Sequence, residues 1–219
     1  MDSENEDELR RSVRKYISRR QRALTRRQSS PNFPRDRSLI FHIVPESFDP
    51  YAAEGAFRTF GPSNLVPNSS SNDWTRRFTR DGYRYDLSIA NRRSFVTLLR
   101  SGAVEFGIVP GGDRGLDSDT VRWIFKESLY ELASYLWEAK PSPKLAFISL
   151  LVTGATADGI IGLPDGFVGD QANSFEETTF RLGPLVLKAE EVGTRQFQPM
   201  FNLLFQCAGF RNAPDLLQF

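Results

Sequence analysis

The chain of 219 residues contains one histidine and one cysteine, so few side chains are available as a base or a nucleophile. His42 lies in an apolar segment whose neighbours Phe41 and Ile43 would point to the opposite face of a strand. This placement favours a packed or hydrogen-bonded structural histidine over a catalytic base. Cys207 ends an apolar helical segment next to Phe205, which predicts a buried, unreactive thiol.

Acidic side chains gather at the start of the longest predicted helix and in one polar loop. Asp113, Asp117 and Asp119 lie near the helix start, and Glu176 and Glu177 lie in the loop. Metal-dependent nucleases use carboxylate clusters, but these acids have no regular spacing and no partner lysine. Aspartate is common at helix N-termini because it caps the helix and suits the helix dipole. We therefore expect no metal site, no cofactor and no catalytic residue.

The most distinctive charged segment is a run of cations near the N-terminus. Residues 9–29 contain nine basic and no acidic side chains, although the net charge of the chain is only +1. The other residues contribute 19 basic and 27 acidic side chains, so a mildly acidic body carries one cationic segment. The nine cations are Arg10, Arg11, Arg14, Lys15, Arg19, Arg20, Arg22, Arg26 and Arg27.

The same segment has the periodicity of a helix. Leu9, Val13, Ile17 and Leu24 are spaced by four or seven residues and form a narrow apolar stripe, with Tyr16 beside it. Prolines that follow residue 30 end the helix. Because the cations repel one another, the helix needs either a surface for its stripe or anions around it.

Two interpretations of this helix remain open. Arginine side chains neutralise phosphates and release counterions, which predicts a contact with DNA or RNA. Alternatively, the helix is a connector whose arginines face acidic residues on the body or on another protein. Residues 74–80 pose a similar choice: Arg76, Arg77 and Arg80 alternate with aromatic residues and are suited to stacking on bases and binding phosphates, or they form a sheet edge with cations facing water.

The body of the chain has the pattern of one α+β domain. Strands are predicted at 38–45, 83–89, 94–99, 104–109, 145–152 and 180–187, and helices at 119–139 and 194–207. The short turns favour an antiparallel meander, and the irregular order of elements favours a mixed, mostly antiparallel sheet with two long packing helices. We divide the chain into an acidic tip, arginine-rich helix and proline-rich hinge at 1–37 and a single domain at 38–219.

Composition excludes several classes of protein. Forty per cent of the residues are hydrophobic and 18 are phenylalanine, which is enough for a core and argues against disorder. No apolar run approaches the roughly 18 residues that a membrane-spanning helix needs, and the charged start lacks the apolar stretch of a secretory signal. We therefore expect a cytoplasmic protein that does not contact membranes.

Several short motifs occur in the order found in one group of bacterial proteins. After the arginine-rich helix they are Leu39-Ile40-Phe41-His42-Ile43-Val44-Pro45, Asp81-Gly82-Tyr83, Leu99-Arg100-Ser101-Gly102-Ala103-Val104-Glu105, the strand at 143–152, Gln198-Pro199-Met200-Phe201-Asn202 and Ala208-Gly209-Phe210. Over most of residues 8–212 the chain resembles the region that follows the Schlafen-type AlbA-like DNA-binding domain, in proteins often described as helix-turn-helix or ATP-binding. The AlbA-like domain itself, from which nuclease activity would be inferred, is absent here. The resemblance therefore implies no catalytic or ATP-binding residue.

What the resemblance implies is a class of process, namely nucleic-acid binding and antiphage defence in bacteria. Our first hypothesis is a non-enzymatic accessory or sensor module that contacts nucleic acid through the helix at 9–27. The second is a protein–protein interaction subunit of a defence complex. Its helix would dock on a partner protein that carries the missing domain, and its loops at 61–74 and 164–178 would face that partner. Such a subunit could also form an oligomer. The third is a hydrolase or nuclease that uses the Asp113–Asp119 cluster with a divalent ion.

Overall fold

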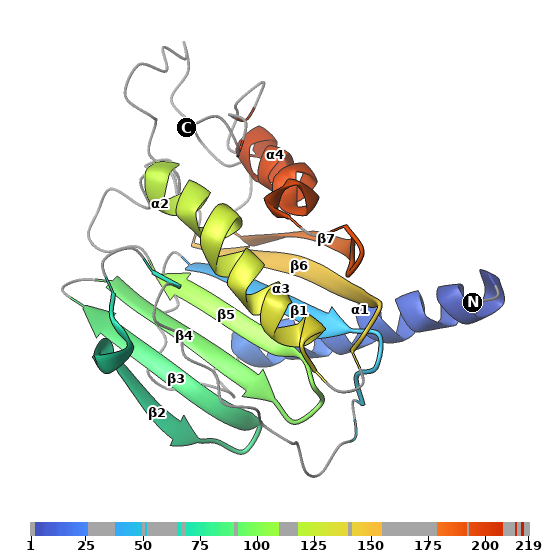
Figure 1. The fold of residues 1–219 in the computed structure, drawn as a ribbon, viewed down its shortest axis with the longest axis horizontal. Helices are drawn as coiled ribbons and strands as arrows, with labels where there is room; N and C mark the ends of the chain where they lie inside the picture. The colour runs from blue at the N-terminus through green and yellow to red at the C-terminus, as the bar shows by residue number, and fades with distance from the viewer. Residues whose placement is uncertain are drawn as a thin grey trace.

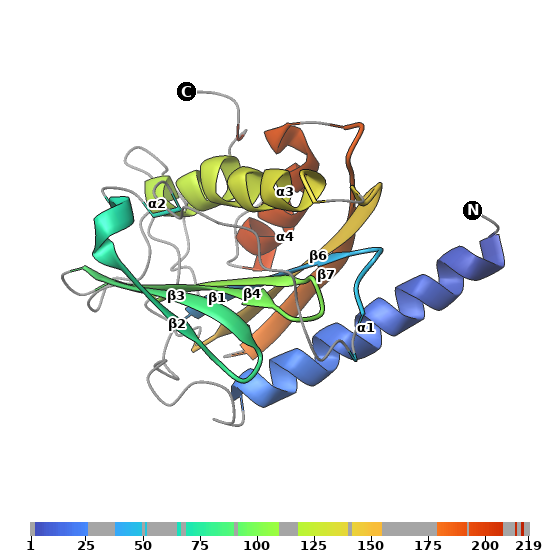
Figure 2. The same ribbon diagram turned by 60° about the horizontal axis from the view of Figure 1, so that its bottom comes forward.

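The computed structural model describes residues 3–25, 38–49, 51, 65–66, 69–89, 92–109, 118–139, 142–154, 179–191, 193–207, 213 and 216. Its described strands form one antiparallel sheet with helices on both faces, which confirms the α+β class (Figures 1 and 2). The strand order is β2-β3-β4-β5-β1-β6-β7.

The arrangement of the strands explains their sequences. They are β1 (Ser38–Pro45), β2 (Trp74–Phe78), β3 (Gly82–Ile89), β4 (Arg92–Leu99), β5 (Val104–Val109), β6 (Leu145–Thr153) and β7 (Thr179–Lys188). The strands β3 to β5 form the meander that the short turns predict, β2 pairs with β3 at its edge, and β1 inserts between β5 and β6. The strands β1 and β6 are buried along nearly their whole length, which accounts for their continuous apolar sequences.

One face of the sheet is covered by a layer of helices from the C-terminal half of the chain (Figure 2). These are α2 (Ser118–Trp123), the π-helical turn η2 (Ile124–Ser128), α3 (Leu129–Trp137), the 3-10 turn η3 (Thr194–Phe197) and α4 (Gln198–Cys207). Phe125 joins the layers, because its ring makes edge-to-face contacts with Phe41 of β1 at 5.4 Å and with Phe201 of α4 at 5.1 Å. The main core of the protein lies between this layer and the sheet.

The N-terminal helix α1 (Ser3–Thr25) covers the opposite face of the sheet, and its first turns extend beyond it (Figures 1 and 2). The predicted stripe makes the contact: Val13, Tyr16 and Ile17 are buried, and Leu9 and Leu24 are partly buried. The sheet residues beneath them include Val44, Leu99, Ala103 and Phe147. The sheet thus supplies the surface that the cationic helix needs.

Three sequence expectations require comment. Cys207 is exposed, not buried: its spacing from Met200 and Leu204 places it at the edge of the buried stripe of α4, but it ends the helix, where Gln206 is exposed as well. The end of the predicted loop at 61–74 contains the 3-10 turn η1 (Ser71–Asp73) and the first residue of β2. The loop at 164–178 lies outside the described residues.

Candidate nucleic-acid interface

Five cations of α1 are exposed, on the side away from its buried stripe. They are Arg11, Arg14, Lys15, Arg19 and Arg22. Arg11, Lys15, Arg19 and Arg22 follow one another at intervals of three or four residues, so they form a row along one face of the helix. At 1.5 Å of rise per residue this row is about 16 Å long. Packing of the opposite face fixes the direction in which the row points.

The remaining cations of the segment are placed differently. Arg10 donates from Nη2 to Glu6 Oε1 at 2.6 Å, a half-buried pair within one helix that contributes little to stability. Arg14, Lys15 and Arg19 form no ion pair with a residue in the described part of the chain. Two further predicted contacts, Arg26 and Arg27, lie outside the described residues.

Arg20 lies in the buried stripe, because it follows Val13 by seven residues and Ile17 by three, and its side chain is 14% exposed. It donates hydrogen bonds to both carboxylate oxygens of Glu105, from Nε at 2.7 Å and from Nη2 at 2.9 Å. Its Nη1 lies 3.0 Å from Asp81 Oδ2. The structure therefore places this arginine in an internal ion pair and not on the exposed row.

Burial and charge act in opposite directions on this pair. Burial by itself raises the pKa of the Glu105 carboxyl, but Arg20 and His42 hold that pKa well below its usual range. Burial likewise opposes the charged form of Arg20, yet the negative charges of Glu105 and Asp81 raise its pKa above the ordinary value. Both shifts favour the charged forms of Glu105 and Arg20 at neutral pH.

Glu105 belongs to a row of polar side chains that crosses the sheet beneath α1. Antiparallel partners share a face of the sheet, and the row consists of directly opposed partners. Its members are Arg84 on β3, Thr97 on β4, Glu105 on β5, His42 on β1 and Ser149 on β6, each at most 6% exposed. Apolar clusters flank this polar row, one around Val44 and Phe147 and one around Ile40 and Leu151.

The polar row contains the residue types of a Ser–His–Glu triad but not its geometry. His42 Nδ1 lies 3.3 Å from Glu105 Oε1, and neither ring nitrogen has a well-aligned hydrogen-bond partner among the described residues. Within the same residues Ser149 Oγ also has no hydrogen-bond partner. Because α1 covers the row and both side chains are at most 2% exposed, no substrate can reach them. The arrangement agrees with a structural role for His42.

The predicted carboxylate cluster is mostly outside the described structure. Asp113, Asp117, Glu176, Glu177 and the side chain of Asp119 lie outside the described part of the chain. In the parts of the chain that are described, no group of three or more histidine, cysteine, aspartate or glutamate residues is placed to hold a metal ion.

Residues 74–80 form the edge strand β2 and the turn that follows it. Only Trp74 of this strand is buried, so β2 is a sheet edge whose cations face water. Binding of nucleic acid by these cations stays a prediction. The side chain of Arg77 is 51% exposed, and its Nη2 lies 3.1 Å from Oδ2 of Asp86. Arg76 and Arg80 are exposed.

The contact between Arg20 and Asp81 brings the two cationic segments together. Asp81 lies in the turn between β2 and β3, directly after Arg80, whereas Arg20 is preceded by the exposed Arg19 on α1. Figure 2 shows the C-terminal end of α1 beside this hairpin. We call the exposed cations of α1 and of this turn the cationic surface: Arg11, Arg14, Lys15, Arg19, Arg22 and Arg80. Arg76 is not part of it, because its partner Tyr85 packs in the main core and Arg76 therefore projects from the face of the sheet opposite α1. Sequence reasoning predicted each segment but not their proximity.

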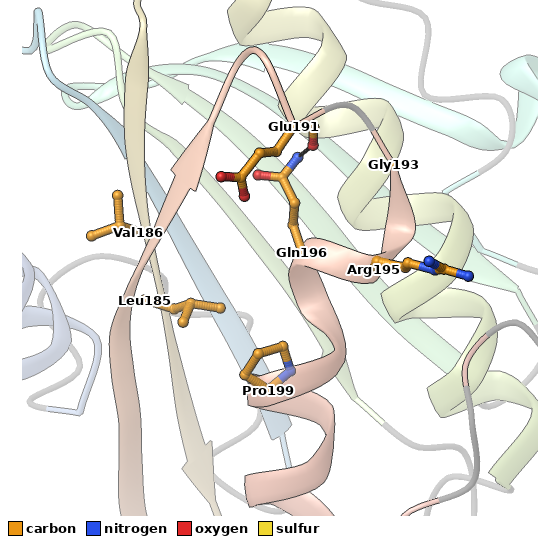
Figure 3. Close-up of a pocket in the computed structure, with 7 residues that line it drawn as sticks. All are labelled: Leu185, Val186, Glu191, Gly193, Arg195, Gln196 and Pro199. Atoms are coloured by element: carbon orange, nitrogen blue, oxygen red, sulfur yellow. Dashed lines mark hydrogen bonds between the residues drawn. The ribbon is translucent and has the colours of Figure 1, made fainter.

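A shallow pocket of about 420 Å³ lies at the other end of the sheet, between β7 and the start of α4 (Figure 3). It is lined by Leu185, Val186, Glu191, Gly193, Arg195, Gln196 and Pro199. Gln196 donates to the carbonyl oxygen of Glu191 and accepts a hydrogen bond from the amide of Lys188 at 2.9 Å. These polar groups close the turn after β7, so their hydrogen-bonding capacity is directed to the fold.

Comparisons with known proteins add no evidence about the function of this chain. The chain matches no protein-family model, no curated protein and no solved structure. The described helices include none that is long and apolar enough to span a membrane. The resemblance to Schlafen-associated proteins therefore stays a prediction from the short motifs.

Proposed function

We propose that this protein is a non-enzymatic accessory module that contacts nucleic acid through the cationic surface. The observation that carries the proposal is the row of exposed cations on α1, about 16 Å long and held in one direction by the packing of the opposite helix face. A row of this kind suits a linear polyanion better than a small ligand, because its charges are spread along a line and not gathered in a pocket.

Electrostatics supports an oriented encounter with such a polyanion. Duplex DNA carries one negative charge per roughly 1.7 Å of its axis, so the row lies alongside several phosphates at once. Outside residues 9–29 the chain carries more acidic than basic side chains, 27 against 19. The acidic body repels a polyanion while α1 attracts it, which directs the nucleic acid to one face.

The cellular setting is a separate part of the proposal. The short motifs resemble proteins associated with bacterial antiphage defence, and on that basis we place the module in a cytoplasmic defence system. A partner protein that carries a catalytic domain would then supply the chemistry.

The test is binding of labelled DNA and RNA, measured by fluorescence anisotropy between about 50 and 200 mM salt. The test variant combines Lys15→Gln and Arg19→Gln, two neighbouring members of the exposed row on α1. The matched control combines Lys126→Gln and Arg195→Gln, which remove the same charge from the helical layer on the other face of the sheet. Both variants keep the residues that pack α1 against the sheet.

We expect the α1 variant to bind more weakly and the slope of log affinity against log salt to fall in magnitude by about 1.4 to 1.8, the value for two lost phosphate contacts. The control should keep the slope of the native protein. Equal effects of the two variants would refute a specific interface on α1. If the protein binds no nucleic acid at all, the protein-docking hypothesis for α1 would replace this one, and a partner would be sought whose association depends little on salt.

A further inference from the structure

Phe78 is an aromatic side chain on the surface of the edge strand β2, with 75% of its area exposed. Its ring contacts that of Tyr83 on β3, with centroids 4.8 Å apart and planes inclined by 57°. The ring of Tyr83 in turn meets that of Tyr85 edge-to-face at 5.0 Å, and Tyr85 is buried. Three rings thus form a row that is anchored in the core at one end and presents Phe78 to solvent at the other.

The hairpin that carries Phe78 is tightly closed. The amide of Thr79 donates to the carbonyl oxygen of Gly82 at 2.7 Å, and the amide of Gly82 donates to the hydroxyl of Thr79 at 3.2 Å. Gly82 packs so closely on β4 that an added Cβ would lie 2.0 Å from the carbonyl oxygen of Leu98. The exposed ring therefore projects from a fixed backbone, which lowers the entropy cost of binding a ligand there.

Two exposed cations flank this ring. Arg76 lies two residues before Phe78 and so projects from the same face of β2, and Arg80 lies in the turn two residues after it. Arg77 projects from the other face, where it meets Asp86. An exposed aromatic ring between cations is the arrangement that binds single strands, because a base stacks on the ring while guanidinium groups contact phosphates.

We propose that Phe78 is a base-stacking residue and that, together with Arg76 and Arg80, it binds single-stranded DNA or RNA. This inference rests on the proposed function and narrows its ligand to strands with unpaired bases. In a duplex the faces of each base are already stacked on neighbours, so Phe78 has no face to contact. Addition of a peptide strand to β2 is disfavoured, because cations on an edge strand oppose such pairing.

The experiment compares the affinities of the intact protein and its variants for oligothymidine, oligouridine and a duplex, each of about 16 nucleotides, the upper end of known single-strand site sizes. The test variant is Phe78→Ala and the conservative variant is Phe78→Trp, which keeps a stacking ring. Leu203→Ala is the control, because Leu203 is an exposed apolar side chain (45%) on α4, away from β2. Thermal unfolding of each variant verifies its fold.

We expect Phe78→Ala to weaken single-strand binding by about 5- to 150-fold, the range for loss of one stacking contact. Phe78→Trp and Leu203→Ala should bind single strands within a few fold of the native protein, and duplex affinity should be the same for all four proteins. The relative affinities for oligothymidine and oligouridine identify which polymer is preferred.

Other outcomes separate this inference from the proposed function. Unchanged single-strand binding by Phe78→Ala, or an equal loss of duplex binding, would overturn the stacking role. Binding of duplex alone, through α1, would overturn it too but leave the proposed function intact. Absence of any nucleic-acid binding by the native protein would overturn both, and β2 would then be examined as a contact for a protein.

Discussion

Replacement of Arg20 by methionine is the sharpest test of the buried ion pair beneath α1. Methionine keeps an unbranched apolar stem in the stripe but removes two hydrogen bonds to Glu105, at 2.7 and 2.9 Å, and the 3.0 Å contact with Asp81. The carboxylate of Glu105, which is 1% exposed, then keeps its 3.3 Å contact with His42 Nδ1 but has lost its guanidinium partner. The variant therefore leaves a buried carboxylate without its cationic partner.

The expected loss is about 3–5 kcal/mol, the cost of leaving one member of a buried ion pair without its partner. That is a large fraction of the roughly 5–15 kcal/mol by which domains are stable. Urea unfolding followed by the fluorescence of the three tryptophans measures it. Arg19→Met is the matched control, since Arg19 is exposed, and it should change the free energy of unfolding by no more than about 0.5 kcal/mol.

The double variant Arg20→Met/Glu105→Gln separates the ion pair from simple packing. Because glutamine leaves no unpaired charge in the interior, we expect the double variant to be more stable than Arg20→Met alone, with a coupling energy of up to about 3 kcal/mol. If the double variant lost as much free energy of unfolding as Arg20→Met and Glu105→Gln lose together, the pair would contribute no specific interaction.

The dependence of stability on pH gives an independent readout. In the native protein the pKa of Glu105 is depressed, so its contribution is present above the unfolded value of about 4.3 and is lost as the pH falls further. In Arg20→Met, burial without the guanidinium raises that pKa, so stability falls as the pH rises above about 4.3. A loss below about 1 kcal/mol with an unchanged pH dependence would refute our account of the pair.

Three further predictions concern single groups. Tyr16→Phe removes a 2.6 Å hydrogen bond to Ser101 Oγ and should lower the free energy of unfolding by about 0.5–1.5 kcal/mol. Because burial raises the pKa of Tyr16 to about 12, the difference in tyrosinate absorbance between native protein and variant should titrate near that pH. A midpoint near the ordinary value of about 10 would contradict this prediction. Gly82→Ala places a methyl group 2.0 Å from the Leu98 carbonyl oxygen and should destabilise by about 1–3 kcal/mol, so an unchanged melting temperature would disprove the close approach. Cys207 is exposed and should react with a thiol reagent in the native state, whereas protection until unfolding would show that it is buried.

Local sequence signals predicted most of the sheet. The apolar runs of β1 and β6 and the short turns between β3, β4 and β5 are properties of contiguous residues, and each of these strands forms where its pattern indicates. The sequence predicts β2 only as one of two alternatives, because Thr75, Arg76 and Arg77 are consecutive polar residues and give no alternation of apolar and polar side chains. Its assignment depends on pairing with β3, which a local pattern cannot reveal.

The candidate site was predicted less completely. The stripe of α1 and the exposed cations follow from helical periodicity, but Arg20 was grouped with the exposed residues although its spacing from Val13 and Ile17 places it in the stripe. Glu105 was missed as well. An acid within the apolar strand Val104–Val109 is a signal of a buried, paired charge, and its partner lies 85 positions away in the chain.

The polar row connects the stability of the fold to the orientation of the proposed interface. A stripe of aliphatic side chains such as Val13 and Ile17 would pack against the sheet in several positions, because apolar contacts have no direction. The bidentate pair of Arg20 and Glu105 has a direction, and a shift of α1 by one turn, about 5.4 Å, would break it and place the guanidinium against apolar residues around Ile40. A single buried polar residue fixes register in this way in coiled coils. We infer that the pair fixes α1 in the one position that directs Arg11, Lys15, Arg19 and Arg22 outward, so that the buried arginine sets the direction of the exposed cations.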